Sequence, residues 1–129
     1  MMKREIISTT QAPKAIGPYN QAVKAEGTFI FTAGQIPLHP TTGEIVGKNI
    51  SEQTEQALKN LQAVLEAGGS GLAHAVKTTV FLQDMKDFAA MNEVYARFFS
   101  ESPPARSAFQ VVALPKEALV EVECVALVP

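Results

Sequence analysis

The chain has 129 residues, of which 47% are apolar and 19% are charged, and its formal net charge is -2. This length and balance are typical of one domain with its own hydrophobic core, so we expect a single domain over residues 1–129. The one cysteine, Cys124, excludes an internal disulfide, and the weak negative charge argues against a nucleic-acid partner. No apolar run approaches the roughly 18 residues of a spanning helix, so we expect a cytoplasmic protein that does not enter a membrane.

Three short strands are predicted near the start of the chain, over residues 3–8, 19–24 and 28–35. Glu26-Gly27 separates the second strand from the third and is typical of a hairpin turn. A loop is predicted over residues 36–48, because four residues that break helices and strands fall there: Pro37, Pro40, Gly43 and Gly47.

The spacing of the apolar residues then becomes helical. Apolar side chains recur three and four positions apart and predict one buried helix face, formed by Ala57, Leu58, Leu61, Val64 and Leu65. Asn49 or Ser51 can cap the start of this helix, and Gly68-Gly69 ends it.

A strand over residues 76–82 and a second helix follow. Asp84 or Asp87 can cap the second helix. Its apolar stripe consists of Phe88, Met91, Tyr95, Phe98 and Phe99. Pro103-Pro104 ends this segment, and the last two strands are predicted over residues 106–112 and 119–127.

This order of elements favours an α+β fold. We expect a two-layer sandwich in which one six-stranded mixed sheet carries both helices on one face. The other face would expose Phe29, Phe31 and many aliphatic side chains. Such a face is too apolar for water alone, so we expect further copies of the chain to cover it, most simply in a closed ring.

Two charged residues in the last third of the chain suggest a site. Arg106 follows Pro103-Pro104 at the start of a strand, and Glu121 lies in the last strand, where Glu123 shares its face. A guanidinium binds a carboxylate bidentately, and a carboxylate on a stiff strand can hold and activate water. The pair predicts a site for a small anion that reacts with water. A surface salt bridge of Arg106 and a solvated face for both glutamates are the alternatives.

If subunits bury the sheet face that carries Glu121, its carboxylate needs a partner, and Arg106 is one candidate.

Three more positions have both a functional and an ordinary structural interpretation. Tyr19 follows a stiff Gly-Pro pair or is simply half-buried, and Gly34 permits a close approach to the backbone or marks a bulge. Asn92 interrupts an apolar helix face, where it needs a hydrogen-bond partner, local or otherwise.

Metal chemistry and nucleophilic triads find little support in the sequence. His39 and His74 are the only histidines and lack the spacing of metal ligands. Cys124 lies in a predicted strand without a matched histidine, so we expect neither a metal site nor a thiol or serine triad.

Six motifs in series resemble the Rid family, also called YjgF, and most closely its RidA subgroup. They are Ala15-Ile16-Gly17-Pro18-Tyr19, Thr32-Ala33-Gly34-Gln35-Ile36-Pro37, Val76-Lys77-Thr78-Thr79-Val80-Phe81-Leu82, Asp87-Phe88 with Asn92-Glu93-Val94-Tyr95, Pro104-Ala105-Arg106-Ser107, and Leu114-Pro115-Lys116 with Glu121-Val122-Glu123. The resemblance implies a chorismate-mutase-like fold and a homotrimer with clefts between subunits. It also implies hydrolysis of 2-imino acids, derived from enamines such as 2-aminoacrylate, to 2-oxo acids and ammonia without a cofactor or metal.

The resemblance assigns roles by position. Arg106 matches the arginine that binds the substrate carboxylate, and Glu121 the glutamate that positions and activates water. Tyr19 matches a tyrosine that lines the cleft and contacts substrate or water, so the resemblance implies that all three are catalytic. Gly34 matches a glycine of the cleft wall. Two further positions beside the site are matched by Phe88 and Asn92.

The chain departs from the family pattern at two positions. Ala108 stands where many members have cysteine, but the contact there comes from the main-chain carbonyl, which alanine retains. Ala33 stands where some members have serine, which removes a polar contact. The alternatives to a 2-iminobutanoate/2-iminopropanoate deaminase are an endoribonuclease that inhibits translation, a non-catalytic sensor of 2-oxo acids, and a holdase chaperone.

Overall fold

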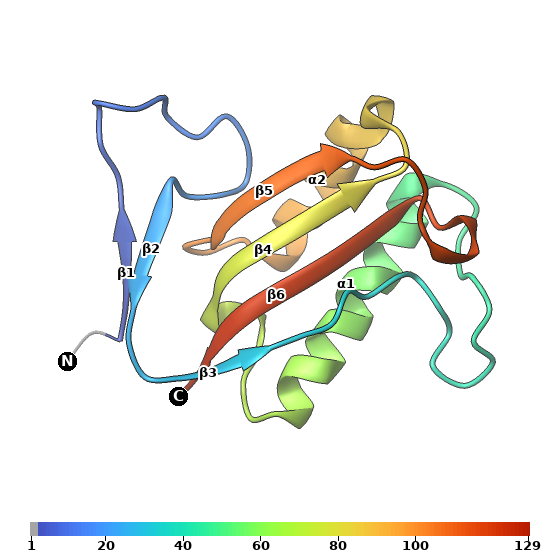
Figure 1. Ribbon diagram of the computed structural model, residues 1–129, viewed down its shortest axis with the longest axis horizontal. Helices are drawn as coiled ribbons and strands as arrows, with labels where there is room; N and C mark the ends of the chain where they lie inside the picture. Colours follow the sequence, from blue (N-terminus) through green and yellow to red (C-terminus); the bar gives the residue numbers. More distant parts are fainter. Residues whose placement is uncertain (1–2) are drawn as a thin grey trace.

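Six strands lie in two sheets in the computed structural model, which describes residues 3–129 (Figure 1). The smaller sheet is an antiparallel ribbon of β1 (Arg4–Ile7) and β2 (Ala22–Ala25). The main sheet has the order β3-β6-β4-β5, with bounds Thr28–Phe31, Val120–Val128, Ala75–Leu82 and Ala105–Gln110. The β4–β5 pair is parallel and the other two pairs are antiparallel, so the main sheet is mixed.

The expected hairpin at Glu26-Gly27 is wrong, and so is the single six-stranded sheet. β2 pairs with β1, whereas β3 pairs with β6. Gly27 has a φ of 132°, a conformation that side chains disfavour, and the chain there passes from one sheet to the other. A bridge between Asn20 and Ala105 joins the ribbon to the main sheet. Alternation of side chains predicts a strand but not its partner.

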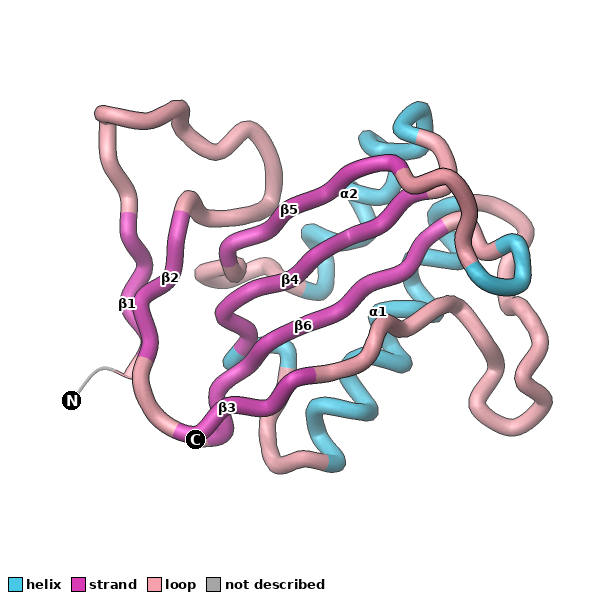
Figure 2. Tube along the Cα trace, viewed as in Figure 1, coloured by secondary structure: helices cyan, strands magenta, loops and turns pink. Residues whose placement is uncertain are grey.

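Both helices cover the same face of the main sheet, as expected (Figure 2). They are α1 (Ile50–Ala67) and α2 (Phe88–Phe98). Asn49 caps α1 through its Oδ1, which accepts a hydrogen bond from the Glu52 N–H at 2.9 Å, and Gly68 ends the helix. Short 3₁₀ turns span Leu72–His74, Met85–Asp87 and Pro115–Glu117. Asp84 caps the second of these turns, directly before α2.

The hydrophobic core lies between the helices and the main sheet. Its buried members include Leu58, Leu61, Leu65, Met91, Tyr95, Val120, Val122 and Cys124. The predicted alternation of the last strand is confirmed, because Val120, Val122 and Cys124 face the helices. Burial raises the pKa of the Cys124 thiol to about 12, so this cysteine is a neutral core residue.

The opposite face of the main sheet carries no helix within residues 3–129 (Figure 1). Phe31 is 73% exposed and Phe109 is 46% exposed, and Phe109 meets Phe81 edge to face at 5.4 Å. Exposed aromatic side chains on a sheet favour an interaction surface, although the closed ring stays a prediction. Neither α1 nor α2 is long and apolar enough to cross a membrane.

Candidate functional site

Arg106 extends from β5 toward the helix layer. In the parallel register it stands beside Thr78 of β4, and neighbouring side chains in register share a face. The Thr78 hydroxyl is buried and hydrogen-bonds with the Tyr95 hydroxyl of α2 at 2.6 Å. Because β5 is the edge of the sheet, the guanidinium lies where the helix layer meets the rim of the molecule.

Three aromatic rings and one amide surround the Arg106 guanidinium. Its central carbon lies 5.2 Å from the ring centroid of Tyr19, 5.6 Å from that of Phe88 and 4.9 Å from that of Tyr95, within cation–π range. Its Nη1 donates a hydrogen bond to Asn92 Oδ1 at 2.7 Å. No carboxylate of residues 3–129 forms an ion pair with it. The site therefore holds a half-buried cation with most of its donors free.

Burial lowers the pKa of Arg106, while Tyr95 and Tyr19 act in the opposite direction. A guanidinium nevertheless stays charged at neutral pH. Removing a charge from water is unfavourable unless a counter-charge replaces the lost hydration. The environment of Arg106 consequently favours an anion from outside the chain.

The loop before β2 brings Tyr19 to this position. The Tyr19 N–H donates to the Gly17 carbonyl at 2.8 Å, and the Ile16 N–H donates to the Tyr19 hydroxyl at 3.3 Å. A Cβ on Gly17 would lie 3.4 Å from Arg106 Nη2, so this glycine brings the loop close to the guanidinium. Asn20 fixes the loop to the chain that enters β5, through bonds to the carbonyls of Pro103 and Pro104.

The backbone of Ala108 lies in β5, the edge strand of the main sheet. The Pro104 carbonyl accepts a bond from Asn20 on the outer side of this strand, and the Val111 N–H donates inward to Leu82. Backbone groups alternate in direction along a strand. The N–H and carbonyl of Ala108 therefore point outward from the edge of the sheet, two residues along β5 from Arg106.

Glu121 belongs to the other face of the main sheet. It stands in register with Phe81, and the chain beyond β3 runs beside it, joined by the reciprocal backbone bonds of Gln35 and Val122. A Cβ on Gly34 would lie 2.7 Å from the Glu121 carboxyl carbon and would overlap one carboxylate oxygen. The close approach expected at Gly34 thus occurs. Burial, and secondly the Glu123 carboxylate, raise the pKa of Glu121.

A single chain does not bring Arg106 and Glu121 together. Their register partners, Thr78 and Phe81, are three positions apart in β4 and point to opposite faces of the sheet. Within one chain Arg106 bonds to Asn92 and forms no ion pair with Glu121, so their pairing across a subunit boundary stays a prediction. Each chain therefore carries two candidate half-sites on opposite sides of the sheet, one around Arg106 and one around Glu121.

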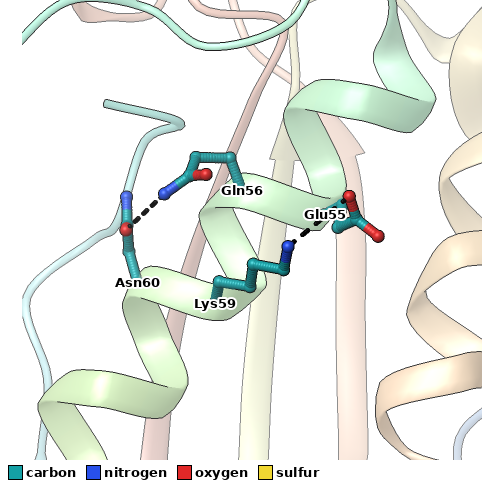
Figure 3. Close-up of polar contacts among 4 residues, drawn as sticks. All are labelled: Glu55, Gln56, Lys59 and Asn60. Carbon is teal, nitrogen blue, oxygen red and sulfur yellow. Dashed lines mark hydrogen bonds and ion pairs between the residues drawn. The ribbon is translucent and has the colours of Figure 1, made fainter. Parts of the chain in front are cut away.

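A separate hollow of about 450 Å³ lies between α1 and the segment that follows Gly34. Its lining includes Ile36, Leu38, Asn60 and Val64. Asn60 Nδ2 donates to the carbonyls of Ile36 and Leu38. Gln56 Nε2 donates to Asn60 Oδ1 at 2.8 Å, as Figure 3 shows. These bonds fix the course of the chain beyond Gly34.

Sequence patterns assigned no site role to Tyr95, which lies beside Arg106, or to Gln21, which anchors the loop that reaches Arg106. Tyr95 was expected only as part of the apolar stripe of α2, although its position three residues after Asn92 places both on one helix face. Gln21 holds the loop before β2, and no periodic pattern marks it.

Metal ligation has no evident location in the described part of the chain. No group of three His, Cys, Asp or Glu side chains there could hold a metal ion. His39 already uses its Nδ1 to accept the N–H groups of Thr41 and Thr42.

Comparison with known proteins adds independent evidence. The family model described as Endoribonuclease L-PSP matches residues 9–128. A RutC family protein of Pyrococcus horikoshii is 57% identical over 123 residues, 95% of this chain and 97% of that protein. The mouse 2-iminobutanoate/2-iminopropanoate deaminase is 49% identical over 96% of this chain and 91% of its own. The solved structure of E. coli TdcF with bound serine has a TM-score of 0.74 and 44% identity, covering 95% of this chain and 98% of that one.

Proposed function

Because the chain belongs to the Rid family, also known as YjgF or RutC, we propose that it is a 2-iminobutanoate/2-iminopropanoate deaminase. It would hydrolyse reactive 2-imino acids to 2-oxo acids and ammonia with its own side chains and water. The name of the mouse relative supports this reaction. The observation that carries the proposal is the half-buried Arg106 cation, which has aromatic neighbours and no carboxylate partner within residues 3–129.

The substrate carboxylate would bind to Arg106. Its free donors form a planar fork that matches the two oxygens of a carboxylate. The Asn92 amide and the ring of Tyr19 hold the guanidinium in place before the ligand arrives, which limits the entropy lost on binding. TdcF was solved with serine, which has the same arrangement of a carboxylate, an α-carbon and a nitrogen as a 2-imino acid.

The site would be completed by a second copy of the chain. One copy supplies Arg106, Tyr19 and the outward carbonyl of Ala108 at the edge of β5. The next copy supplies Glu121 and Gly34 from its open sheet face. A closed ring, most simply a homotrimer, repeats this contact at every interface and also covers the exposed phenylalanines of the open face.

The half-sites suggest a sequence of steps. Arg106 orients the substrate, and the Ala108 carbonyl accepts a hydrogen bond from the iminium nitrogen, which favours the protonated and electrophilic imine. Glu121 takes a proton from water while the water oxygen bonds to C2. That proton passes to the nitrogen, the C–N bond breaks, and ammonia leaves as the Glu121 carboxylate takes the hydroxyl proton and the 2-oxo acid forms. Glu121 then releases this proton to water. Orientation and electrostatic positioning supply most of the acceleration.

The proposal is tested by generating 2-iminobutanoate in situ with a threonine dehydratase. We expect faster formation of 2-oxobutanoate when the protein is added and no acceleration by Arg106→Ala. Arg97→Ala is the matched control, because Arg97 lies exposed on α2 in an ion pair with Glu93. Wild-type rates from Arg106→Ala would refute the assignment.

A ribonuclease is the second candidate, because the matching family model is described as an endoribonuclease. A net charge of -2 offers little attraction to a phosphate backbone. The same preparations should therefore leave RNA intact. RNA cleavage that disappears with Arg106→Ala would favour this candidate over the deaminase, and 2-oxobutanoate binding without turnover would indicate a sensor.

A further inference from the structure

The Gln21 side chain ties down the first half of the loop between β1 and β2. Its Nε2 donates to the carbonyls of Thr9, Ala12 and Pro13 at 3.1, 3.3 and 2.6 Å. Its Oε1 accepts the Thr9 N–H at 2.6 Å. Within residues 3–129, every hydrogen bond that joins residues 9–13 to the rest of the chain involves this one side chain.

The second half of the same loop covers Arg106. Gly17 lies against the guanidinium and Tyr19 stacks near it, and the loop lies beside β5 in Figure 1. Ile16 is 83% exposed, so burial of its side chain does not hold this part of the loop. Residues 9–14 are all exposed as well. Hydrogen bonds, not packing, therefore determine where residues 9–14 lie, and the half-buried residues 17–19 follow them in the chain.

We infer that Gln21 is a positioning residue, which holds the loop of residues 9–18 over Arg106 so that Tyr19 and Gly17 are in place when the substrate carboxylate binds. This inference rests on the proposed function, because it concerns the same carboxylate site. Gln21 does not touch the substrate. It acts through the loop by satisfying backbone groups that would otherwise bond to water.

Loss of the Gln21 hydrogen bonds should change the affinity for the substrate more than the rate of the chemical step. A loop that is already ordered loses little conformational entropy when a ligand binds, whereas a loosened loop must be ordered by the ligand. Loss of the Gln21 bonds should therefore raise KM. The Glu121 half-site belongs to the other face of the sheet, so kcat should change little.

The test uses Gln21→Glu, which keeps the size of the side chain but replaces its two donors by a charged acceptor facing three carbonyl oxygens. We expect KM, and the Kd for 2-oxobutanoate, to rise on the order of ten-fold. The value of kcat should stay within about two-fold of wild type. Trypsin should cleave faster after Lys14, which lies in the loop, and 2-oxobutanoate should slow this cleavage.

Gln11→Glu is the matched control, since it adds the same charge to the same loop at an exposed side chain that makes no hydrogen bond within residues 3–129. It should bind 2-oxobutanoate as wild type does. Gln21→Met, which is neutral and similar in length, replaces Gln21→Glu if the latter does not fold, with the same expected rise in KM and Kd.

Two results would overturn the inference while the proposed function stands. The first is wild-type affinity for 2-oxobutanoate in the Gln21 variants while Arg106→Ala does not bind it. The second is a fall in kcat with KM unchanged, which would place the effect on chemistry. If Arg106→Ala binds 2-oxobutanoate and turns over as wild type does, the proposed function itself fails.

Discussion

The Glu121 carboxylate lies against the backbone of Gly34, where β6 runs beside the chain that continues from β3. No side chain could occupy position 34 without displacing this carboxylate, because even a Cβ would overlap one of its oxygens. The paired backbone bonds of Gln35 and Val122 hold the two segments together at 2.8 and 3.0 Å. The Glu121 carboxylate can thus occupy its position only because residue 34 has no side chain.

Gly34→Ala should consequently reduce imine hydrolysis without unfolding the protein. The added methyl group pushes the Glu121 carboxylate away from the position where it holds water, and a displacement of about 1 Å can reduce a rate about a hundred-fold. Steady-state kinetics and thermal unfolding provide the measurements. Gly71→Ala is the control, because a Cβ at that position meets nothing within 4 Å. Equal activity of the two variants would show that the Gly34–Glu121 contact does not matter.

Asn92→Asp should weaken the binding of 2-oxobutanoate. The amide oxygen lies 2.7 Å from Arg106 Nη1, so a carboxylate of the same shape would give the guanidinium an internal counter-charge. The ligand carboxylate would then compete with that charge, and we expect affinity to fall about ten-fold or more. Calorimetric titration measures the effect. The idea would be wrong if the variant bound the ligand as tightly as wild type.

The pH dependence of the reaction should report Glu121. Burial first, and the Glu123 carboxylate second, raise the pKa of Glu121. A general base acts in its ionised form, so activity should fall as pH decreases through this raised pKa, at a higher pH than for an ordinary glutamate. Glu123→Gln removes the like charge and should move the acidic limb of the kcat/KM profile to lower pH. A limb that stays in place or moves upward would contradict the assignment.

The stability of the fold should also depend on the ionisation of Glu121, but it should fall with rising pH where activity rises. An acid whose pKa is raised by folding binds protons more readily in the folded state than in the unfolded chain. Stability therefore falls as pH rises from the ordinary pKa through the raised one. Glu121→Gln removes this effect, so we expect a higher thermal midpoint at pH 7 together with lost activity. The gain should vanish near about pH 3, well below the ordinary pKa of a glutamate, where both states are protonated, and a gain of equal size at both values would exclude this cause.

The helical elements were predicted well because their signals are local. Asn49 caps α1 as expected and Gly68 ends it. The apolar spacing identified the buried face around Leu58 and Leu61, although Val64, which was expected on that face, is 38% exposed. The alternation in β6 likewise predicted which side chains face the core. The division of the strands between two sheets could not be predicted, because it depends on long-range pairing. The corner at Gly27 illustrates this, since its glycine suits a hairpin and a change of sheet equally well.

The site was predictable in its residue types more than in its arrangement. Tyr19 and Asn92 gather around Arg106 in the structure. The face that Arg106 occupies could not be predicted from β5, because the run from Arg106 to Gln110 does not alternate clearly. The role of Gln21 depends on the conformation of an irregular loop, for which the sequence has no periodic signal.

The most direct test of a site shared between copies is to mix two inactive variants, Arg106→Ala and Glu121→Ala, and to let their subunits exchange. If each site takes Arg106 from one copy and Glu121 from the next, random mixing gives an intact pair at one interface in four, and about a quarter of wild-type activity should return. A mixture that stays as inactive as its two components would contradict a site shared between copies.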